Sequence, residues 1–290
     1  MDELLRPFEF EFFRNGLAVA VLAGALCGLV GVFVVLKGMS YIGHGLSHAI
    51  FGGFAASALL GVNFALGAGA WGVASALMIH GVTRRRVIGA DAAIGVITTA
   101  SFALGLALFA IFGRRGRNFE AALFGSILGV GGEDVWAIAA ITVAVVLIVF
   151  FGYRRLMFTT FDPEVAAASG VRTARVDAVL MLVLAVSILA TMRVLGVTLI
   201  AATLVIPATV ARMLTNSFSR MLVLATLVGA FTGFAGMNLS YHLDVPSGTT
   251  IVLTGAAVFA VVLALTGPKR LRRAAGMDDH APAAQVALVR

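Results

Sequence analysis

Residues 15–36 read NGLAVAVLAGALCGLVGVFVVL, and this run contains no charged side chain. It is long enough to cross the hydrocarbon core of a bilayer as a helix, which takes about 20 apolar residues. Similar runs recur along the chain, too long and continuous for strands, and an open sheet cannot satisfy its backbone in lipid. The sequence therefore predicts an all-α polytopic integral membrane protein with about eight or nine transmembrane helices. The predicted spans are 15–36, 42–60, 63–82, 90–112, 134–151, 174–192, 194–211, 219–241 and 249–266.

The composition supports lipid as the main solvent of this chain. Of its 290 residues, 60% are hydrophobic and 12% are charged, whereas a soluble globular protein carries about 25% charged residues. The net charge of +7 comes from bases grouped between the apolar runs. Lys and Arg in short loops set membrane orientation, so we expect topogenic charge and no nucleic-acid partner.

The basic groups predict which ends of the spans face the cytoplasm. Lys37, 84–86, 154–155 and 269–273 fall on one side if the spans alternate, and that side should be cytoplasmic. The C-terminus is then cytoplasmic and the N-terminus is outside. Three arginines fall on the outer side in this scheme, and a partial or re-entrant helix at residues 119–130 is the interpretation that would change the local count. These arginines are Arg114, Arg115 and Arg117.

Three parts of the chain follow from this pattern. Residues 1–14 mix acids, arginines and aromatic residues, as expected of an amphipathic segment at the membrane interface. Residues 15–268 form the transmembrane domain. Residues 269–290 begin with a basic cluster and continue as an Ala-rich chain, which predicts a flexible cytoplasmic tail.

Several enzyme motifs are missing from the sequence. It contains no GxxxxGK[ST] nucleotide-binding loop, no GxSxG and no HExxH. Any ATP hydrolysis must therefore belong to another chain. Cys27 is the single cysteine, so neither an internal disulfide nor a thiolate cluster is possible.

His44 and His48 are the candidate metal ligands. They stand four residues apart near the start of the second span, and positions i and i+4 of a helix share one face with Cβ atoms about 5–6 Å apart. If Lys37 marks the membrane edge, the pair lies about 10–16 Å deeper, where ionisable groups usually face a pore or a packed interior. The alternative is two structural histidines bonded to carbonyls. A zinc protease is disfavoured because Gly45 stands where its Glu would be.

The sequence resembles the membrane permeases of the ABC-3 group of ATP-driven zinc, manganese and iron importers. Several stretches, in order and spacing, carry this resemblance over residues 15–268. They are GMSYIGHGLSHAIFGG at 38–53, DAAIGV at 91–96, FDPEVAAASGV at 161–171, LIAATLVIPATVARMLT at 199–215 and DVPSGTTIVL at 244–253.

The resemblance implies a metal route along the second span. His48 matches the histidine of the family motif, and His44 replaces the family's aspartate. Imidazole suits Zn²⁺, whereas carboxylate suits Mn²⁺ better. A histidine pair on each of two subunits would offer four nitrogens, compatible with tetrahedral zinc. We therefore expect Zn²⁺ rather than Mn²⁺ as the transported ion, with no permanently bound cofactor.

Residues 161–171 predict a short helix with its own start and stop signals. Asp162 can cap its first turn, Pro163 suits its first position and Gly170 can end it. An ordinary surface helix is one interpretation. The resemblance implies instead a coupling helix that contacts the ATPase through Phe161, Asp162, Ala166 and Gly170. Pro207 lies within the seventh span and either kinks that helix or forms a gating hinge.

The combined expectation is a non-enzymatic permease subunit in a bacterial inner membrane. It should act as a homodimer with a pore on the dimer axis, two copies of a cytoplasmic ATPase and an external solute-binding protein. Two rivals are a self-contained secondary metal transporter and an intramembrane metalloenzyme. The first usually needs intramembrane acids, and the interiors of the predicted spans contain almost none beyond Asp91 and Asp177, both near ends.

Overall fold

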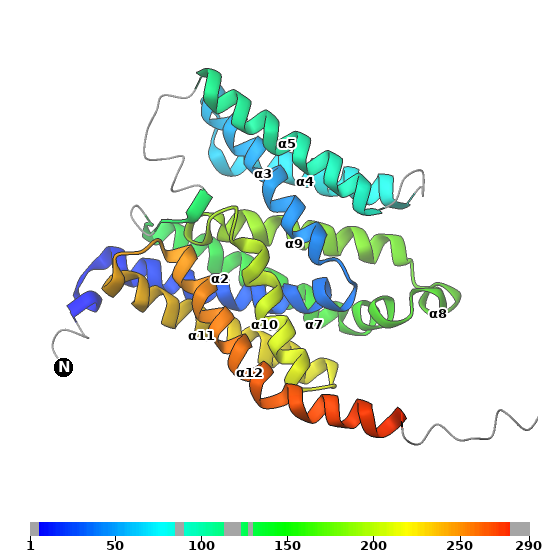
Figure 1. Cartoon of the computed structure of the whole chain (residues 1–290). Helices are drawn as coiled ribbons and strands as arrows, with labels where there is room; N and C mark the ends of the chain where they lie inside the picture. Colours follow the sequence, from blue (N-terminus) through cyan, green and yellow to red (C-terminus); the bar gives the residue numbers. More distant parts are fainter. Residues whose placement is uncertain (1–5, 85–89, 113–122, 127–129, 279–290) are drawn as a thin grey trace, which may run out of the picture.

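The computed structural model describes residues 6–84, 90–112, 123–126 and 130–278. Within these ranges the regular structure is helical, which confirms the predicted all-α class. A 3₁₀ turn, η1 (Arg6–Glu9), precedes the long helices, and one short helix, α8, lies among them (Figure 1). The helices are α2 (Glu11–Leu36), α3 (Ser40–Leu60), α4 (Phe64–Arg84), α5 (Ala90–Phe112), α7 (Gly132–Phe161), α8 (Pro163–Ala168), α9 (Thr173–Leu195), α10 (Ile200–Leu214), α11 (Phe218–Leu243) and α12 (Ser247–Asp278).

Each predicted span corresponds to one long helix. Six of these helices are long and apolar enough to cross a membrane, and two shorter apolar segments lie at Ala92–Leu108 and Ile200–Leu214. The helix α3, which carries both histidines, is not in this set. Since the pattern agrees with eight or nine spans, the membrane-protein fold predicted from sequence is confirmed.

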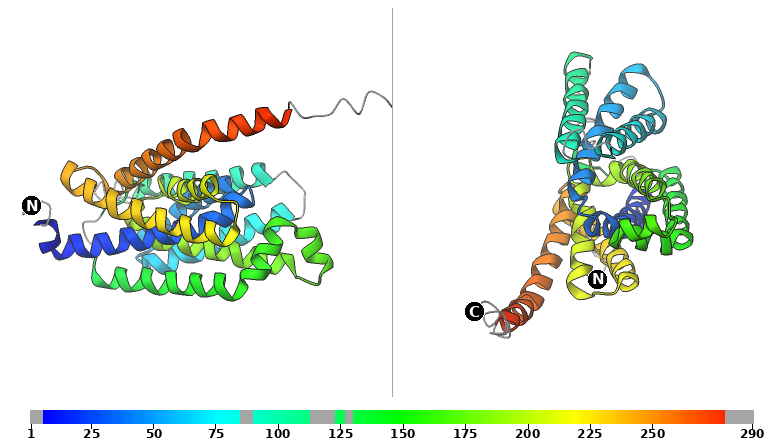
Figure 2. Two further views of the ribbon diagram at one scale, coloured as in Figure 1. Left: turned by 90° about the horizontal axis from the view of Figure 1, so that it is seen from below. Right: turned by 90° about the vertical axis from the view of Figure 1, so that its right-hand side faces the viewer.

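The helices form two groups. In the first, α2 packs against α7, α9, α10 and α11, while α12 covers α10 and α11. In the second, α3 packs against both α4 and α5. Figure 2 shows the α3–α5 group leaning away from the rest of the bundle, to which α4 joins it through α9.

The core of the first group is the middle of α2. Side chains from Leu26 to Val34 are almost completely buried. A Cβ added at Gly24 would lie 2.0 Å from the carbonyl oxygen of Gly229, and one at Gly28 would lie 2.1 Å from that of Ala225. The backbones of α2 and α11 therefore touch directly, as small residues allow in membrane helices.

One end of the bundle contains the segments that are predicted from the sequence to be cytoplasmic. Figure 1 shows α8, the turn between α2 and α3, and the end of α12 together at one end, with the start of α2 at the other. The helix α12 continues to Asp278, into the segment predicted as the tail. Residues 279–290 lie outside the described ranges, as do Arg114, Arg115 and Arg117.

The predicted re-entrant segment is described only at 123–126 and 130. Leu123 O accepts hydrogen bonds from Thr198 N at 3.2 Å and from Thr198 Oγ1 at 2.6 Å. Ser126 N donates to Arg193 O at 3.0 Å. These bonds attach the described part of the segment to the connection between α9 and α10.

Candidate functional site

The two histidines of α3 face each other. The Nε2 atoms of His44 and His48 are 3.2 Å apart, and the ring centroids are 4.6 Å apart with an interplanar angle of 80°. His44 is exposed and His48 is half-buried. The helical spacing therefore brings both nitrogens to one accessible point, as predicted from the i and i+4 positions.

This separation suits two ligands of one ion. At Zn–N bonds of about 2.0–2.1 Å, tetrahedral geometry places two nitrogens about 3.3 Å apart. The distance between the two Nε2 atoms therefore allows both to bind one ion. It supplies only two ligands, however, and no group of three or more His, Cys, Asp or Glu side chains suited to a metal occurs in the described part of the chain.

Close packing against α5 holds this part of α3. A Cβ added at Gly45 would lie 2.8 Å from Thr98 Cγ2, and one at Gly52 would lie 2.5 Å from Ser101 O. The ring of Phe102 packs edge-on against His48, with centroids 4.5 Å apart. The glycines thus let α5 approach α3 closely, which brings the Phe102 ring beside His48.

Ser101 joins three helices beside the pair. Its hydroxyl accepts a hydrogen bond from Trp71 Nε1 of α4 at 2.7 Å and donates to Ala49 O of α3 at 3.1 Å. Ser101 is buried, so the network fixes the backbone next to His48. Ser101, Trp71 and Phe102 could not be predicted as part of the site from the sequence, because only the packing of α3, α4 and α5 brings them there.

One polar atom of the pair is unsatisfied. His48 Nδ1 is buried and has no hydrogen-bond partner among the described residues. Histidines that bind metals usually donate their second N–H to an acceptor, and an unsatisfied buried polar atom costs about 1–3 kcal/mol. The pair in a single chain therefore lacks an acceptor for His48 Nδ1 as well as further ligands for an ion.

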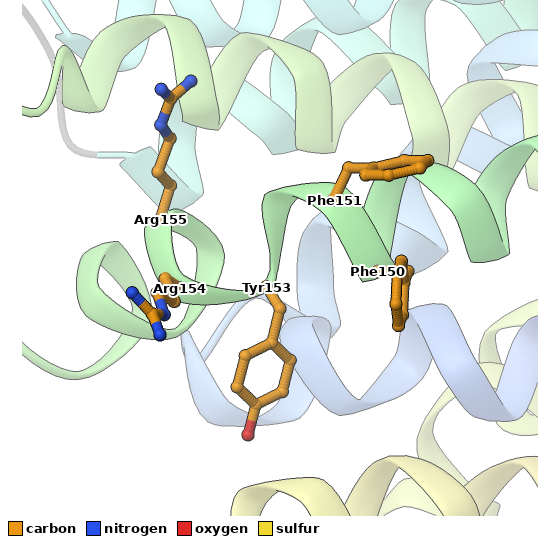
Figure 3. Close-up of a pocket in the computed structure, with 5 residues that line it drawn as sticks. All are labelled: Phe150, Phe151, Tyr153, Arg154 and Arg155. Carbon is orange, nitrogen blue, oxygen red and sulfur yellow. The ribbon is translucent and has the colours of Figure 1, made fainter.

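The pocket drawn in Figure 3 is separate from the histidine pair. It lies along α7 and is lined by Phe150, Phe151, Tyr153, Arg154 and Arg155. Its side chains project to different sides of the helix, and none is a carboxylate, thiolate or imidazole. Aromatic and guanidinium groups are poor ligands for a divalent cation, so this pocket is not a second metal site.

The short helix α8 has the predicted ends. Asp162 Oδ1 accepts a hydrogen bond from Val165 N at 2.9 Å, and Pro163 occupies the first helical position. At the other end Gly170 has φ +84°. Val171 N donates to Ala166 O and Gly170 N donates to Ala167 O, both at 3.0 Å, which is the Schellman pattern.

Burial separates the four residues predicted to contact an ATPase. Phe161, Asp162 and Gly170 are exposed, whereas Ala166 is completely buried. Ala166 therefore anchors α8 to its own chain. The surface that α8 offers to a partner consists of the residues on either side of it, including Val165, which is 47% exposed.

Pro207 lies inside α10 and is buried. It cannot donate the helical hydrogen bond to Thr203 O. Thr203 Oγ1 donates to Ile200 O at 2.8 Å. Pro207 is remote in sequence from the histidine pair, although α10 contacts α3.

Comparisons with known proteins agree with this architecture. The family model described as ABC 3 transport family matches residues 9–266. The chain is 37% identical to the manganese transport system membrane protein MntC of Halalkalibacterium halodurans, over 90% of this chain and 88% of that protein. It is 34% identical to the manganese import system permease protein ScaB of Streptococcus parasanguinis, over 94% of this chain and 96% of that one.

Two solved structures share the fold. PsaBC from Streptococcus pneumoniae, solved in complex with a Fab, contains a chain that matches with a TM-score of 0.83 and 32% identity, covering 90% of this chain and 94% of that one. An inward-facing metal-chelate type ABC transporter matches with a TM-score of 0.67 and 21% identity, covering 86% and 84%. The second likeness concerns the fold alone.

Proposed function

Because this chain belongs to the ABC 3 transport family, we propose that it is the membrane permease of an ATP-driven importer of Zn²⁺. An external solute-binding protein delivers the ion, and two copies of a cytoplasmic ATPase drive its passage. The observation that carries this proposal is the His44–His48 pair, whose Nε2 atoms meet 3.2 Å apart on an accessible face of α3.

The choice of zinc rests on the chemistry of the pair. Imidazole nitrogen suits Zn²⁺, while carboxylate oxygen suits Mn²⁺, and both side chains here are imidazoles. Mn²⁺ is the second candidate, because MntC and ScaB are named for manganese. The two candidates share the route and differ only in the ion that the pair favours.

A homodimer would complete the site. Zinc commonly takes four ligands, and one chain supplies two imidazoles. His44 is exposed in the single chain, so a second copy can bring its own pair to the same ion. The pore then lies between the two α3 helices, and opening the dimer at either end would release the ion.

The coupling helix is α8. Its surface is exposed except at Ala166, and it stands at the end of the bundle where the basic residues Lys37, Arg154 and Arg155 gather. That end faces the cytoplasm of a bacterium in our proposal, in agreement with the positive-inside rule. The ATPase would bind there and move α8, which lies directly between α7 and α9.

The metal route is tested by removing one ligand. His48→Ala should abolish ATP-driven uptake of Zn²⁺ by vesicles that contain the permease and its ATPase, because a lone His44 cannot hold the ion. The matched control is His242→Ala, since His242 is exposed on α11 and shares a hydrogen bond with the carbonyl of Asn238. Zinc uptake at the parental rate by His48→Ala would show that the pair is structural.

The coupling role is tested at the end of α8. Gly170→Val should lower the ATP hydrolysis stimulated by the loaded binding protein about tenfold, because a β-branched residue is strained at φ +84°. Gly170→Asn should keep most of the stimulation, since asparagine tolerates this conformation better. Basal hydrolysis reports assembly in both variants. Equal stimulation in Gly170→Val and the parent would contradict a coupling role.

A further inference from the structure

One ammonium group joins three helices at the α8 end of the bundle. Lys37 Nζ lies 2.9 Å from Asp177 Oδ1 and donates a hydrogen bond to Thr159 O at 3.1 Å. Lys37 follows α2 directly, Thr159 is in the last turn of α7, and Asp177 is in the second turn of α9. The Lys37 side chain is only 14% exposed. It therefore points into the junction of the three helices.

Within the described residues, Lys37 provides a hydrogen bond to the carbonyl oxygen of Thr159 and a counter-ion to the carboxylate of Asp177. Thr159 O would normally accept from the N–H four residues later, but that residue is Pro163, which has none. The buried Asp177 Oδ1 makes no hydrogen bond within the described ranges, so its contact with Lys37 at 2.9 Å is an ion pair. Removing the ammonium group would therefore leave the Thr159 carbonyl without its donor and the Asp177 carboxylate without its counter-ion.

A purely topogenic lysine would extend into water or snorkel to the interface. Lys37 instead makes one hydrogen bond and one ion pair with elements far away in sequence. Gly38 has φ +66°, and Met39 N donates to Val34 O at 2.8 Å, so the chain turns tightly behind Lys37. The helix α3 begins at Ser40, and His44 follows in its second turn.

The two acceptors flank α8. Thr159 stands just before its cap at Asp162, and Asp177 follows soon after its stop at Gly170. Any displacement of α8 acts on the end of α7 and the start of α9 together. Because Lys37 holds both helices, the same displacement reaches the tight turn that leads into the histidine-bearing helix.

We propose that Lys37 is a positioning residue that transmits movement of α8 to α3, through its contacts with Thr159 and Asp177. This inference rests on the proposed function, because it assigns the mechanical link between the ATPase contact and the metal pair. Lys37 does not touch the ion. Its role is to keep the α7–α8–α9 unit and the α2–α3 turn moving as one body.

The experiment measures hydrolysis and uptake by the full permease reconstituted with its ATPase and a Zn²⁺-loaded binding protein. Lys37→Met and Asp177→Asn should each lower stimulated hydrolysis and zinc uptake at least tenfold, while basal hydrolysis stays within twofold of the parent. Lys37→Arg should restore most of the stimulation. Asp177→Asn keeps the basic residue that orients the chain, so it remains informative if Lys37→Met fails to insert.

The matched control is the ion pair at the opposite ends of the same two helices, where Arg193 of α9 contacts Asp134 of α7. Asp134→Asn should keep stimulated hydrolysis near the parental level. Parental stimulation in Lys37→Met and Asp177→Asn would overturn the inference, as would an equal loss in Asp134→Asn. A parent that shows no response to either Zn²⁺ or Mn²⁺ would instead contradict the proposed function.

Discussion

The contacts between α2 and α11 and between α3 and α5 both depend on glycines, yet they differ in what the glycines approach. In the first, Gly24 and Gly229 bring two backbones into direct contact. In the second, Gly52 also approaches backbone, at Ser101 O, but Gly45 beside the histidines faces the side chains of Thr98 and Ile94. Polar groups such as Ser101 lie among the apolar ones there.

This difference indicates which helix contact is rigid and which can adjust. Where two backbones touch directly, no side chain lies between them that could change its rotamer. The α2–α11 contact is therefore suited to a rigid core. Side chains at the α3–α5 contact can change rotamer, and the same region carries His44, His48 and the Trp71–Ser101 hydrogen bond. The proposed transport site therefore lies beside the adjustable contact at Gly45, while Gly52 joins the same two helices through a backbone contact.

The largest effect on stability should come from Gly24→Ala. The added Cβ would lie 2.0 Å from Gly229 O, and relieving that clash requires α2 and α11 to separate. Overpacking costs about 1–3 kcal/mol and sometimes more, and here we expect the upper end or a failure to assemble. Thermal unfolding in detergent measures the loss. Unchanged stability would show that the backbones are not in contact.

The same substitution at Gly45 should have a smaller effect on stability and a clear effect on transport. Its Cβ would meet Thr98 Cγ2 at 2.8 Å and Ile94 Cγ2 at 2.9 Å, which are side-chain methyl groups that can shift. We expect a loss of about 1 kcal/mol with metal uptake reduced severalfold, because α3 moves relative to Phe102.

Gly81→Ala is the control for both glycine variants. A Cβ there meets nothing within 4 Å, and alanine is a better helix former than glycine by about 1 kcal/mol. Stability should therefore stay equal or rise slightly. If Gly45→Ala destabilised the protein as much as Gly24→Ala, the distinction between the two helix contacts would be wrong.

The smallest effect on stability, but a change in selectivity, is expected for His44→Asp. His44 is exposed, so folding should be unaffected. Replacing imidazole nitrogen by carboxylate oxygen should shift the ratio of Mn²⁺ to Zn²⁺ uptake upward by about tenfold. Competition between the two ions in reconstituted vesicles measures this ratio. The same ratio in variant and parent would show that His44 does not contact the ion.

Much of the fold and part of the site follow from local sequence. The apolar runs predict the spans because helix length in lipid is set by bilayer thickness. The ends of α8 follow from Asp162, Pro163 and Gly170, which act on their own backbone. The histidine pair follows from helical periodicity alone, and the Nε2 atoms of His44 and His48 indeed meet.

The remaining features depend on residues that are far apart in the chain. Lys37 could be read from sequence only as a charge at a span end, because nothing local relates it to Asp177 or to Thr159. Ala166 looks equivalent to the other alanines of α8, yet it alone among them is buried. The partners of His48 on α5 also came only from the packing.

The sequence by itself thus determined the membrane class, the helix spans, the caps of α8 and the spacing of the two histidines. Each of these is set by interactions within a few residues or by contact with the surrounding solvent. Only the tertiary structure decided that α3–α5 form a separate group, that Ser101 fixes the site and that Lys37 joins three helices. Those features require helices distant in sequence to pack, and backbone contact at glycines such as Gly24 decides which helices do so.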